Sequence, residues 1–165
     1  MFRDDPYVPR RPASAFTLVE VLIVVVILGV LASIVIPQFA DATAQSNRSV
    51  FAANIKEYAK AAQLFRFDTG EYLEDSASGA VPTGFDNYID ATKWQAGTPI
   101  GGVWDAEYQD VGGFTSAVGV HFNGTGSTRD DLYMTSIDEL IDDGDLAIGV
   151  FRRIADGRYY YIIRE

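Results

Sequence analysis

The sequence has no cysteine, one histidine and few basic residues, and each shortage excludes a class of function. Without cysteine the chain forms no disulfide and offers neither a thiolate metal ligand nor a cysteine nucleophile. The composition alone does not exclude a Ser–His–Asp triad around His121, but the sequence contains no nucleophile-elbow pattern. The 13 basic and 23 acidic residues give a formal charge of −10, which disfavours nucleic acid because phosphate binding depends on clustered Lys and Arg. We therefore predict neither an enzyme nor a nucleic-acid-binding protein.

Charge is almost absent from a long apolar run near the N terminus. The run covers residues 16–36 and is closed by Pro37. A helix of this length spans about 31 Å, the thickness of a bilayer's hydrocarbon core, so we predict a transmembrane segment at 16–36. Glu20 is the one ionisable residue inside it. A charge costs about 2.5–3.5 kcal/mol at mid-membrane and less near the edge, which marks Glu20 as a candidate functional residue.

A partner for Glu20 follows if the chain is cut between Ala15 and Phe16. The cut creates an α-amino group with an ordinary pKa near 8, mostly positive at neutral pH. Opposite charges about 4 Å apart attract by roughly 4 kcal/mol at an effective dielectric near 20, enough to offset the burial cost. The amine can belong to the same chain or to a neighbouring subunit. Only the second choice sets an axial register between chains and explains an acid inside the membrane.

These residues resemble the prepilin signature shared by type IV pilins and the pseudopilins of type II secretion systems. In that family a short basic leader is removed before a Phe, the new N terminus is methylated, and a Glu and a Pro recur at the spacings of Glu20 and Pro37 from Phe16. Ala15 stands where the family usually has Gly. The resemblance implies cleavage by a prepilin peptidase between Ala15 and Phe16, methylation of Phe16, and assembly through Glu20 and Pro37 into a filament of this and other pseudopilins on an inner-membrane platform.

The chain order predicts three parts. Residues 1–15 form a leader that is removed; the alternative is an uncut cytoplasmic tail of a single-pass protein. Arg10 and Arg11 ahead of the apolar run place the N terminus in the cytoplasm and the rest in the periplasm. A long helix covers 16–69, with Pro37 expected to kink or locally melt it and Gly70 to end it. Residues 70–165 form a globular periplasmic αβ domain.

The sequence predicts an α+β, pilin-like fold, in which a long helix packs on a small antiparallel sheet. Apolar residues recur at spacings of three and four and should face the sheet, namely Phe51, Ile55, Tyr58, Ala62 and Phe65. A solvated face is expected at Arg48, Lys56, Glu57 and Lys60. Two hairpins are predicted, from residues 103–109 and 116–122 and from 149–154 and 158–163. Short helices are expected at 85–90 and at 137–141, the latter capped by Ser136. Trp94 and Trp104 are expected to pack in a satellite core.

The leading hypothesis is a structural filament subunit, a pseudopilin of a type II secretion system. It is favoured over a type IV pilin of a surface fibre by the missing cysteines and the short two-hairpin domain. A membrane-anchored binding module is the alternative from another class. No cofactor is predicted, with calcium as the open alternative, since the resemblance implies a calcium-binding C-terminal loop in the major pseudopilin. The candidate ligands are Asp130 and Asp131, or Asp142, Asp143 and Asp145, and neither group has EF-hand spacing.

Overall fold

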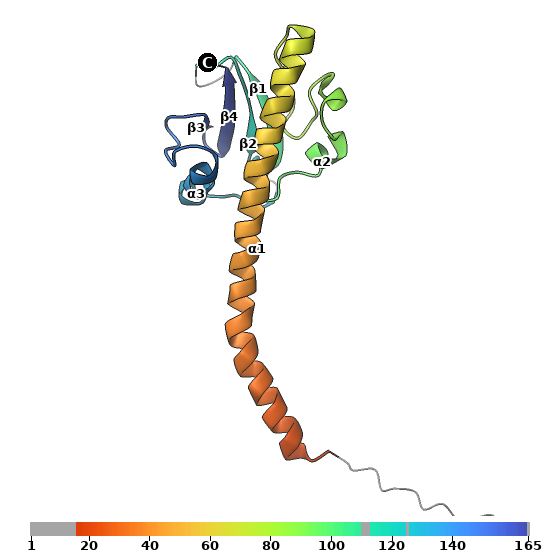
Figure 1. The fold of residues 1–165 in the computed structure, drawn as a ribbon, viewed down its shortest axis with the longest axis vertical. Coiled ribbons are helices and arrows are strands. Elements are labelled where there is room, and N and C mark those ends of the chain that lie inside the picture. The colour runs from red at the N-terminus through yellow and green to blue at the C-terminus, as the bar shows by residue number, and fades with distance from the viewer. Residues whose placement is uncertain (1–15, 110–112, 125, 165) are drawn as a thin grey trace, which may run out of the picture. The chain divides into compact units, whose positions relative to one another are not determined.

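The longest element is the helix α1, Leu18–Thr69, in a computed structural model that describes residues 16–109, 113–124 and 126–164 (Figure 1). It ends where predicted: Gly70 has a φ of 81°, a left-handed conformation that favours glycine. The Gly70 N–H donates to the Arg66 carbonyl at 3.0 Å, which closes the last turn. Pro37 lies inside α1 without interrupting it, so of the two predicted effects, a kink or local melting, the melting is not observed. The missing proline N–H removes one hydrogen bond, and the helical bonds on either side hold the backbone.

The chain divides into two compact units, Met1–Asp41 and Ala42–Glu165, and α1 contributes to both. In the described part of the first unit every residue is exposed, although the segment is almost wholly apolar. Exposed apolar area on this scale is unfavourable in water. By length and composition this helix can cross a membrane, as predicted.

The second unit contains a four-stranded antiparallel sheet. Its strands are β1 (Val103–Tyr108), β2 (Ser116–His121), β3 (Phe151–Ala155) and β4 (Arg158–Arg164). The order β1-β2-β4-β3 confirms the two predicted hairpins and joins them through β2 and β4. Gly119 lies opposite Tyr160 at this junction, where a Cβ would stand 2.2 Å from the Tyr159 carbonyl oxygen. The absence of a side chain at Gly119 therefore allows the two hairpins to pair closely.

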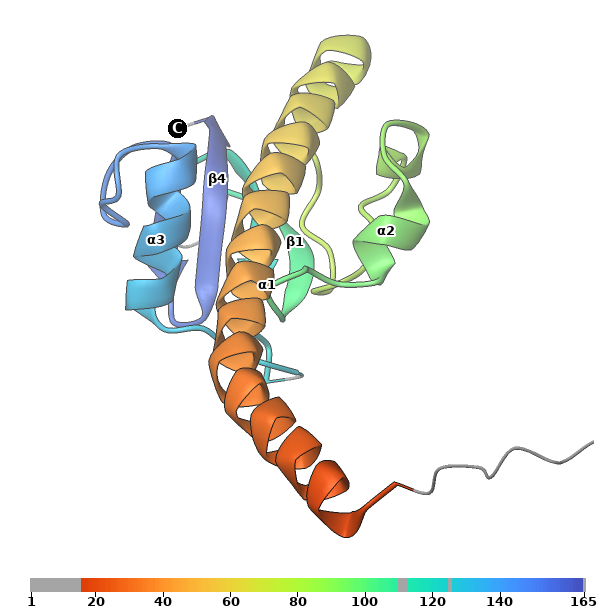
Figure 2. The ribbon, with the colours of Figure 1, turned by 60° about the horizontal axis from the view of Figure 1, so that its bottom comes forward.

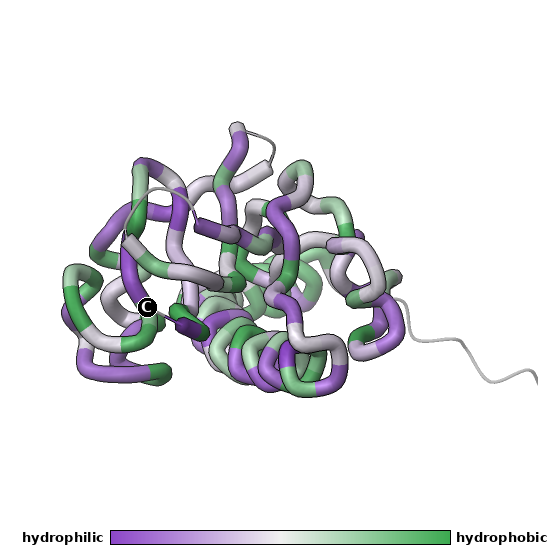
Figure 3. Tube along the Cα trace, turned by 90° about the horizontal axis from the view of Figure 1, so that it is seen from above, coloured by the Kyte–Doolittle hydropathy of each residue, from purple (hydrophilic) through white to green (hydrophobic). Residues whose placement is uncertain are grey.

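The core lies between α1 and the sheet. The predicted apolar stripe is buried throughout, which confirms it. Phe51 stacks on Trp104 with ring centroids 5.2 Å apart, and Tyr58 meets the same indole edge-on at 4.8 Å. Trp94 packs against Tyr58 as well, so both tryptophans belong to the main core and not to a satellite. Figure 3 shows hydrophilic and hydrophobic positions mixed along the tube in this unit, as expected for elements that bury one face.

The short helices differ from their predictions. Residues 85–90 hold only the 3₁₀ turn η1 (Phe85–Asn87), and the unpredicted helix α2 (Ala91–Gln95) follows it with Asp90 as N-cap. The helix α3 covers Asp131–Ile141, longer than predicted, because Asp130 is its N-cap and accepts from the Tyr133 N–H at 2.9 Å. Ser136 lies within α3 and donates to the Tyr133 carbonyl instead of capping. Figures 1 and 2 show α2 and α3 on opposite sides of α1.

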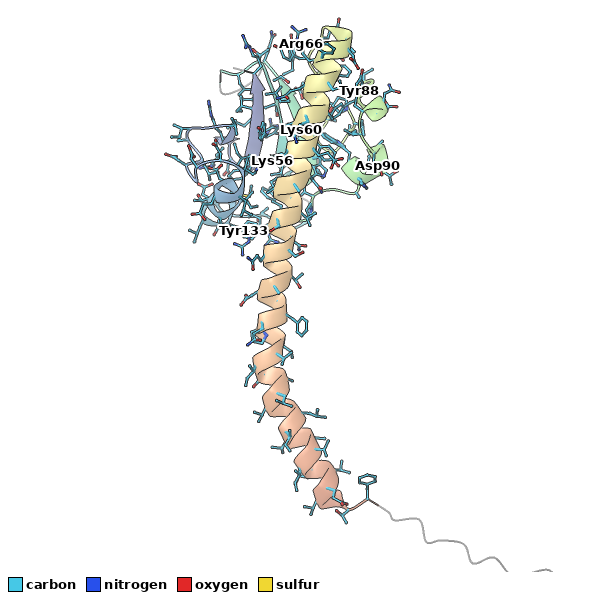
Figure 4. The ribbon with its side chains drawn as sticks, viewed as in Figure 1. Lys56, Lys60, Arg66, Tyr88, Asp90 and Tyr133 are labelled. Carbon is cyan, nitrogen blue, oxygen red and sulfur yellow. The ribbon has the colours of Figure 1, made fainter. Side chains whose placement is uncertain are left out.

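Two of the four residues predicted to form a solvated face instead bind α3. Arg48 donates to Ser136 Oγ at 3.0 Å, and Lys56 Nζ donates to the Leu140 carbonyl at 2.9 Å. Both side chains are half-buried, whereas Glu57 and Lys60 are exposed as predicted. Lys56 and Lys60 are labelled on α1 in Figure 4. The long basic side chains of α1 thus help to dock α3 beside it.

Candidate functional sites

The start of α1 is built around Thr17 and Glu20. The Thr17 N–H and the Thr17 hydroxyl both donate to Glu20 Oε2, each at 2.8 Å, and the Glu20 N–H donates to Thr17 Oγ1 at 3.2 Å. This reciprocal arrangement is a capping box, in which a Thr and a Glu three residues later satisfy each other's backbone donors. The carboxylate therefore has partners within its own chain, which the sequence analysis missed. The sequence signal for this capping box was the Thr-x-x-Glu pattern at the start of a predicted helix.

The remaining predicted processing and assembly residues are placed as follows. Ala15, with the rest of the predicted leader 1–15, lies outside the described residues. Phe16 precedes α1 and is 85% exposed. Pro37 lies in α1 of the same unit, five turns after Glu20, so it shares the helix but not the capping box. Within one chain, then, only Glu20 among these residues has a polar partner that the structure describes.

The single histidine takes part in a polar group that lacks the geometry of a triad. Ser78 Oγ lies 2.6 Å from His121 Nδ1, and Asp105 Oδ2 lies 3.5 Å from the same nitrogen. A triad needs the hydroxyl on one ring nitrogen and the carboxylate on the other. Burial and the nearby Arg158 charge lower the pKa of His121, against the opposing charge of Asp105. A mostly neutral His121 at pH 7 therefore acts as a hydrogen-bonding residue of the fold.

Asp105 and Glu107 form a buried network on the face of β1 that alternates away from α1. The Tyr160 hydroxyl donates to Asp105 Oδ2 at 2.6 Å, and Arg158 forms an ion pair with Glu107. Both carboxylates are only 2% exposed. Burial raises the pKa of Asp105, and the Tyr160 hydrogen bond opposes this shift. This network was not predicted from the sequence, although acids at alternate positions between buried residues of a strand were its signal.

The two acidic groups considered for calcium differ sharply. Asp130 is used as the α3 cap, and Asp131 binds the Tyr159 hydroxyl and Arg153, so both serve the fold. In the second group Asp142 and Asp143 converge with Asp138, which the sequence analysis did not consider. One carboxylate oxygen from each of the three lies within 4.8 Å of the others. Asp145 is not part of this convergence and accepts from the Ala147 N–H.

Asp138 is the unusual member of this acidic group. It is 0% exposed, and neither of its carboxylate oxygens makes a hydrogen bond of regular geometry with any described residue. Burial, followed by the charges of Asp143 and Asp142, raises its pKa to about 6, and the Gly144 amide opposes the shift. Its spacing was visible in the sequence as Asp138-x-x-x-Asp142-Asp143, and the predicted helix at 137–141 already put Asp138 one turn before Asp142, but its burial was not visible there.

Residues 10–36 match the family described as "Prokaryotic N-terminal methylation motif". This match covers the capping box, the apolar run and the predicted cleavage site. The chain thus carries a type IV prepilin-like N terminus that includes the start of α1, and the second half of α1 packs on a four-stranded antiparallel sheet. These features are consistent with a pilin-like fold and resemble those of type IV pilin-like subunits.

Among curated proteins, the chain is homologous to "Type II secretion system core protein G" of Pseudomonas aeruginosa, with 41% identity over 63 residues, 38% of this chain and 44% of that protein. It is also similar to "Type IV wide pilus major component PilA4" of Thermus thermophilus, with 32% identity over 68 residues, 41% of this chain and 52% of that protein. The core protein G of Aeromonas hydrophila is 33% identical over 63 residues, 38% of this chain and 44% of that protein.

The chain thus spans about half or less of the length of the curated relatives it matches. Their names describe components of a secretion system and of a pilus. No solved structure matches the chain at a significant level. Among the described residues, α1 is the helix that is long and apolar enough to cross a membrane.

Proposed function

We propose that this protein is a structural filament subunit, a pseudopilin of a type II secretion system, and not an enzyme. The observation that carries the proposal is Glu20, an acid held at the start of an exposed apolar helix within a methylation motif. After cleavage before Phe16, the new amine of one subunit pairs with Glu20 of the next. The core protein G relatives support secretion as the destination of the filament.

The proposal includes partners and an orientation. A prepilin peptidase removes residues 1–15 and Phe16 is methylated. The subunit then joins copies of itself and other pseudopilins on an inner-membrane assembly platform. The basic side of the apolar run stays in the cytoplasm, and the globular unit lies in the periplasm.

Substitution of Glu20 by Gln separates the charge from the cap. A Gln side chain retains an acceptor oxygen, so the capping box with Thr17 is kept while the negative charge is lost. We expect E20Q to insert and to be processed normally, with filament assembly reduced at least tenfold in a crosslinking assay on membranes. E57Q is the matched control, since Glu57 is an exposed acid of α1 in the globular unit. Normal assembly of E20Q would refute the pairing.

The type IV wide pilus relative supports a second candidate of the same class, a pilin of a surface fibre. A deletion strain distinguishes the two functions. Loss of an exported protein from the medium without loss of long surface fibres supports secretion, and the reverse result supports the pilus. A membrane-anchored binding module would keep its leader, so mass spectrometry of the extracted protein that finds residue 1 would overturn both filament functions.

A further inference from the structure

We propose, on the basis of the filament function proposed above, that the open face of α1 binds the same face of a second copy of this chain. The two helices run parallel and are displaced along their axes by three residues. The open face belongs to the globular unit and consists of Val50, Ala53, Glu57, Lys60, Leu64 and Phe67.

The open face is a continuous stripe along one side of α1. Its residues follow one another at spacings of three and four, which places them in a row on the helix surface. All six side chains are exposed, and Phe67 and Leu64 are the most exposed of the apolar ones, at 85% and 51%. Figure 1 shows α1 in front of the sheet with no described element in front of it. Apolar side chains that gather on an exposed face in this way mark a protein–protein contact.

Two opposite charges occupy the middle of the open face. Glu57 and Lys60 lie between the two apolar pairs at its ends. Neither residue takes part in the ion pairs that join described residues. The open face therefore offers both members of a charge pair to a second copy, and this complementarity of the face with itself identifies the partner.

The charges select the displacement between the two copies. With the helices in register, Glu57 would lie against Glu57 and Lys60 against Lys60, and like charges repel. A displacement of three residues, about 4.5 Å along the axis, brings Glu57 of one copy beside Lys60 of the next. It also brings Leu64 of one copy against Phe67 of the next, and the apolar pair at the other end meets in the same way.

The proposed pairing of Glu20 requires nearly the same displacement. Glu20 comes four residues after Phe16, so a neighbour's amine level with Glu20 displaces the two copies by about 6 Å, counted along α1. The direction is also the same, because the copy that supplies the amine supplies Glu57 and the other copy supplies Lys60. The flexible lysine side chain can span the difference of one residue.

The contact extends from copy to copy instead of closing on itself. One copy uses Glu57 and its neighbour uses Lys60, so the two surfaces in contact are different, and the contact is heterologous. Each copy keeps the second charge for a further neighbour. Heterologous contacts that do not close generate open helical filaments.

Cysteine crosslinking in cell membranes tests the displacement. The chain has no cysteine, so introduced thiols have no competitor in it. We expect L64C and F67C, co-expressed as full chains and oxidised, to give a mixed crosslink about fivefold stronger than either variant expressed alone, because a disulfide needs closely spaced Cα atoms. Packing in register would instead give strong crosslinks in each variant alone.

Charge reversal tests the pairing of Glu57 with Lys60. E57K and K60E each place like charges side by side and should reduce assembly by about tenfold, whereas the exchange E57K/K60E restores opposite charges and should recover it. E57Q brings no like charges together, and an exposed ion pair contributes little, so E57Q should still assemble. D86K and K93E are the matched controls, since both residues are exposed and lie outside α1.

The results separate this contact from the filament function. Assembled filaments without the mixed crosslink, or without recovery in E57K/K60E, would overturn the contact and leave the filament function standing. A crosslink from the open face to a different protein would assign the face to that protein and overturn the contact between copies. Absence of filaments in the wild type would overturn the filament function and this contact with it.

Discussion

Truncation of Phe51 to alanine tests whether α1 is an integral part of the globular unit. Phe51 is 0% exposed, stacks on Trp104 at 5.2 Å and meets Phe151 edge-on at 6.3 Å. It therefore joins α1 to strands at both edges of the sheet, β1 and β3. F51A removes these contacts and leaves a cavity between α1, β1 and β3. None of the three can move to fill the cavity without shifting the others.

The expected cost follows from this position. Phe-to-Ala substitutions in well-packed cores cost about 3–5 kcal/mol. For a unit of about 120 residues, an unfolding entropy of about 2.1 cal/mol/K per residue converts that cost to a fall in Tm of roughly 12–20 °C.

Thermal unfolding of the detergent-solubilised full chain, followed by near-ultraviolet circular dichroism, measures the change. Trp94 and Trp104 are both buried, so the signal reports on this core directly. F67A is the matched control, because Phe67 lies on the same helix and is 85% exposed. A fall in Tm below about 4 °C for F51A, or equal falls for both variants, would contradict the packing of α1 against the sheet.

Two further predictions concern the sheet. G119A should cost about 1–3 kcal/mol in urea unfolding, because its Cβ would force β2 and β4 apart, and an unchanged midpoint would contradict the close pairing. The pKa of His121 in the folded chain lies below its ordinary value of 6.5. Between the folded pKa and 6.5, the unfolded chain therefore binds more protons than the folded chain. The wild type loses stability as the pH falls through this range. H121Q should lack this contribution, and parallel pH profiles of wild type and H121Q would show that His121 does not supply it.

Local patterns in the sequence were enough to predict the main elements. The apolar stripe around Phe51 has helical spacing, Gly70 is suited to a left-handed helix end, and Asp156-Gly157 is a strong hairpin signal. Each of these depends on residues close together in the chain. The partnership of β2 with β4 is not of this kind, because it depends on Gly119 meeting Tyr160 across the fold.

The roles of the acidic residues around α3 were harder to predict from the sequence. From the sequence, Asp130 fits a metal ligand in a loop as well as it fits a helix N-cap. Because Ser136 was chosen as the N-cap, the predicted helix was shorter than α3. The predicted helix at 137–141 already placed Asp138 one turn before Asp142, but this local spacing did not show that Asp138 is buried. Burial of Asp138 is a tertiary property, because it depends on what packs against α3 and not on the local sequence.

In the proposed filament, Glu20 serves both the free subunit and the assembled one. Both hydrogen bonds from Thr17 go to Oε2, and no described residue donates to Oε1. A carboxylate accepts several donors at once, so a neighbour's amine can reach Oε1 without breaking the capping box. In the free chain the box lowers the cost of holding an acid within the apolar run. The roughly 4 kcal/mol attraction of a nearby amine then adds to the helix cap instead of competing with it. On this basis T17V, which removes the hydroxyl, should weaken the cap more than it weakens pairing between subunits.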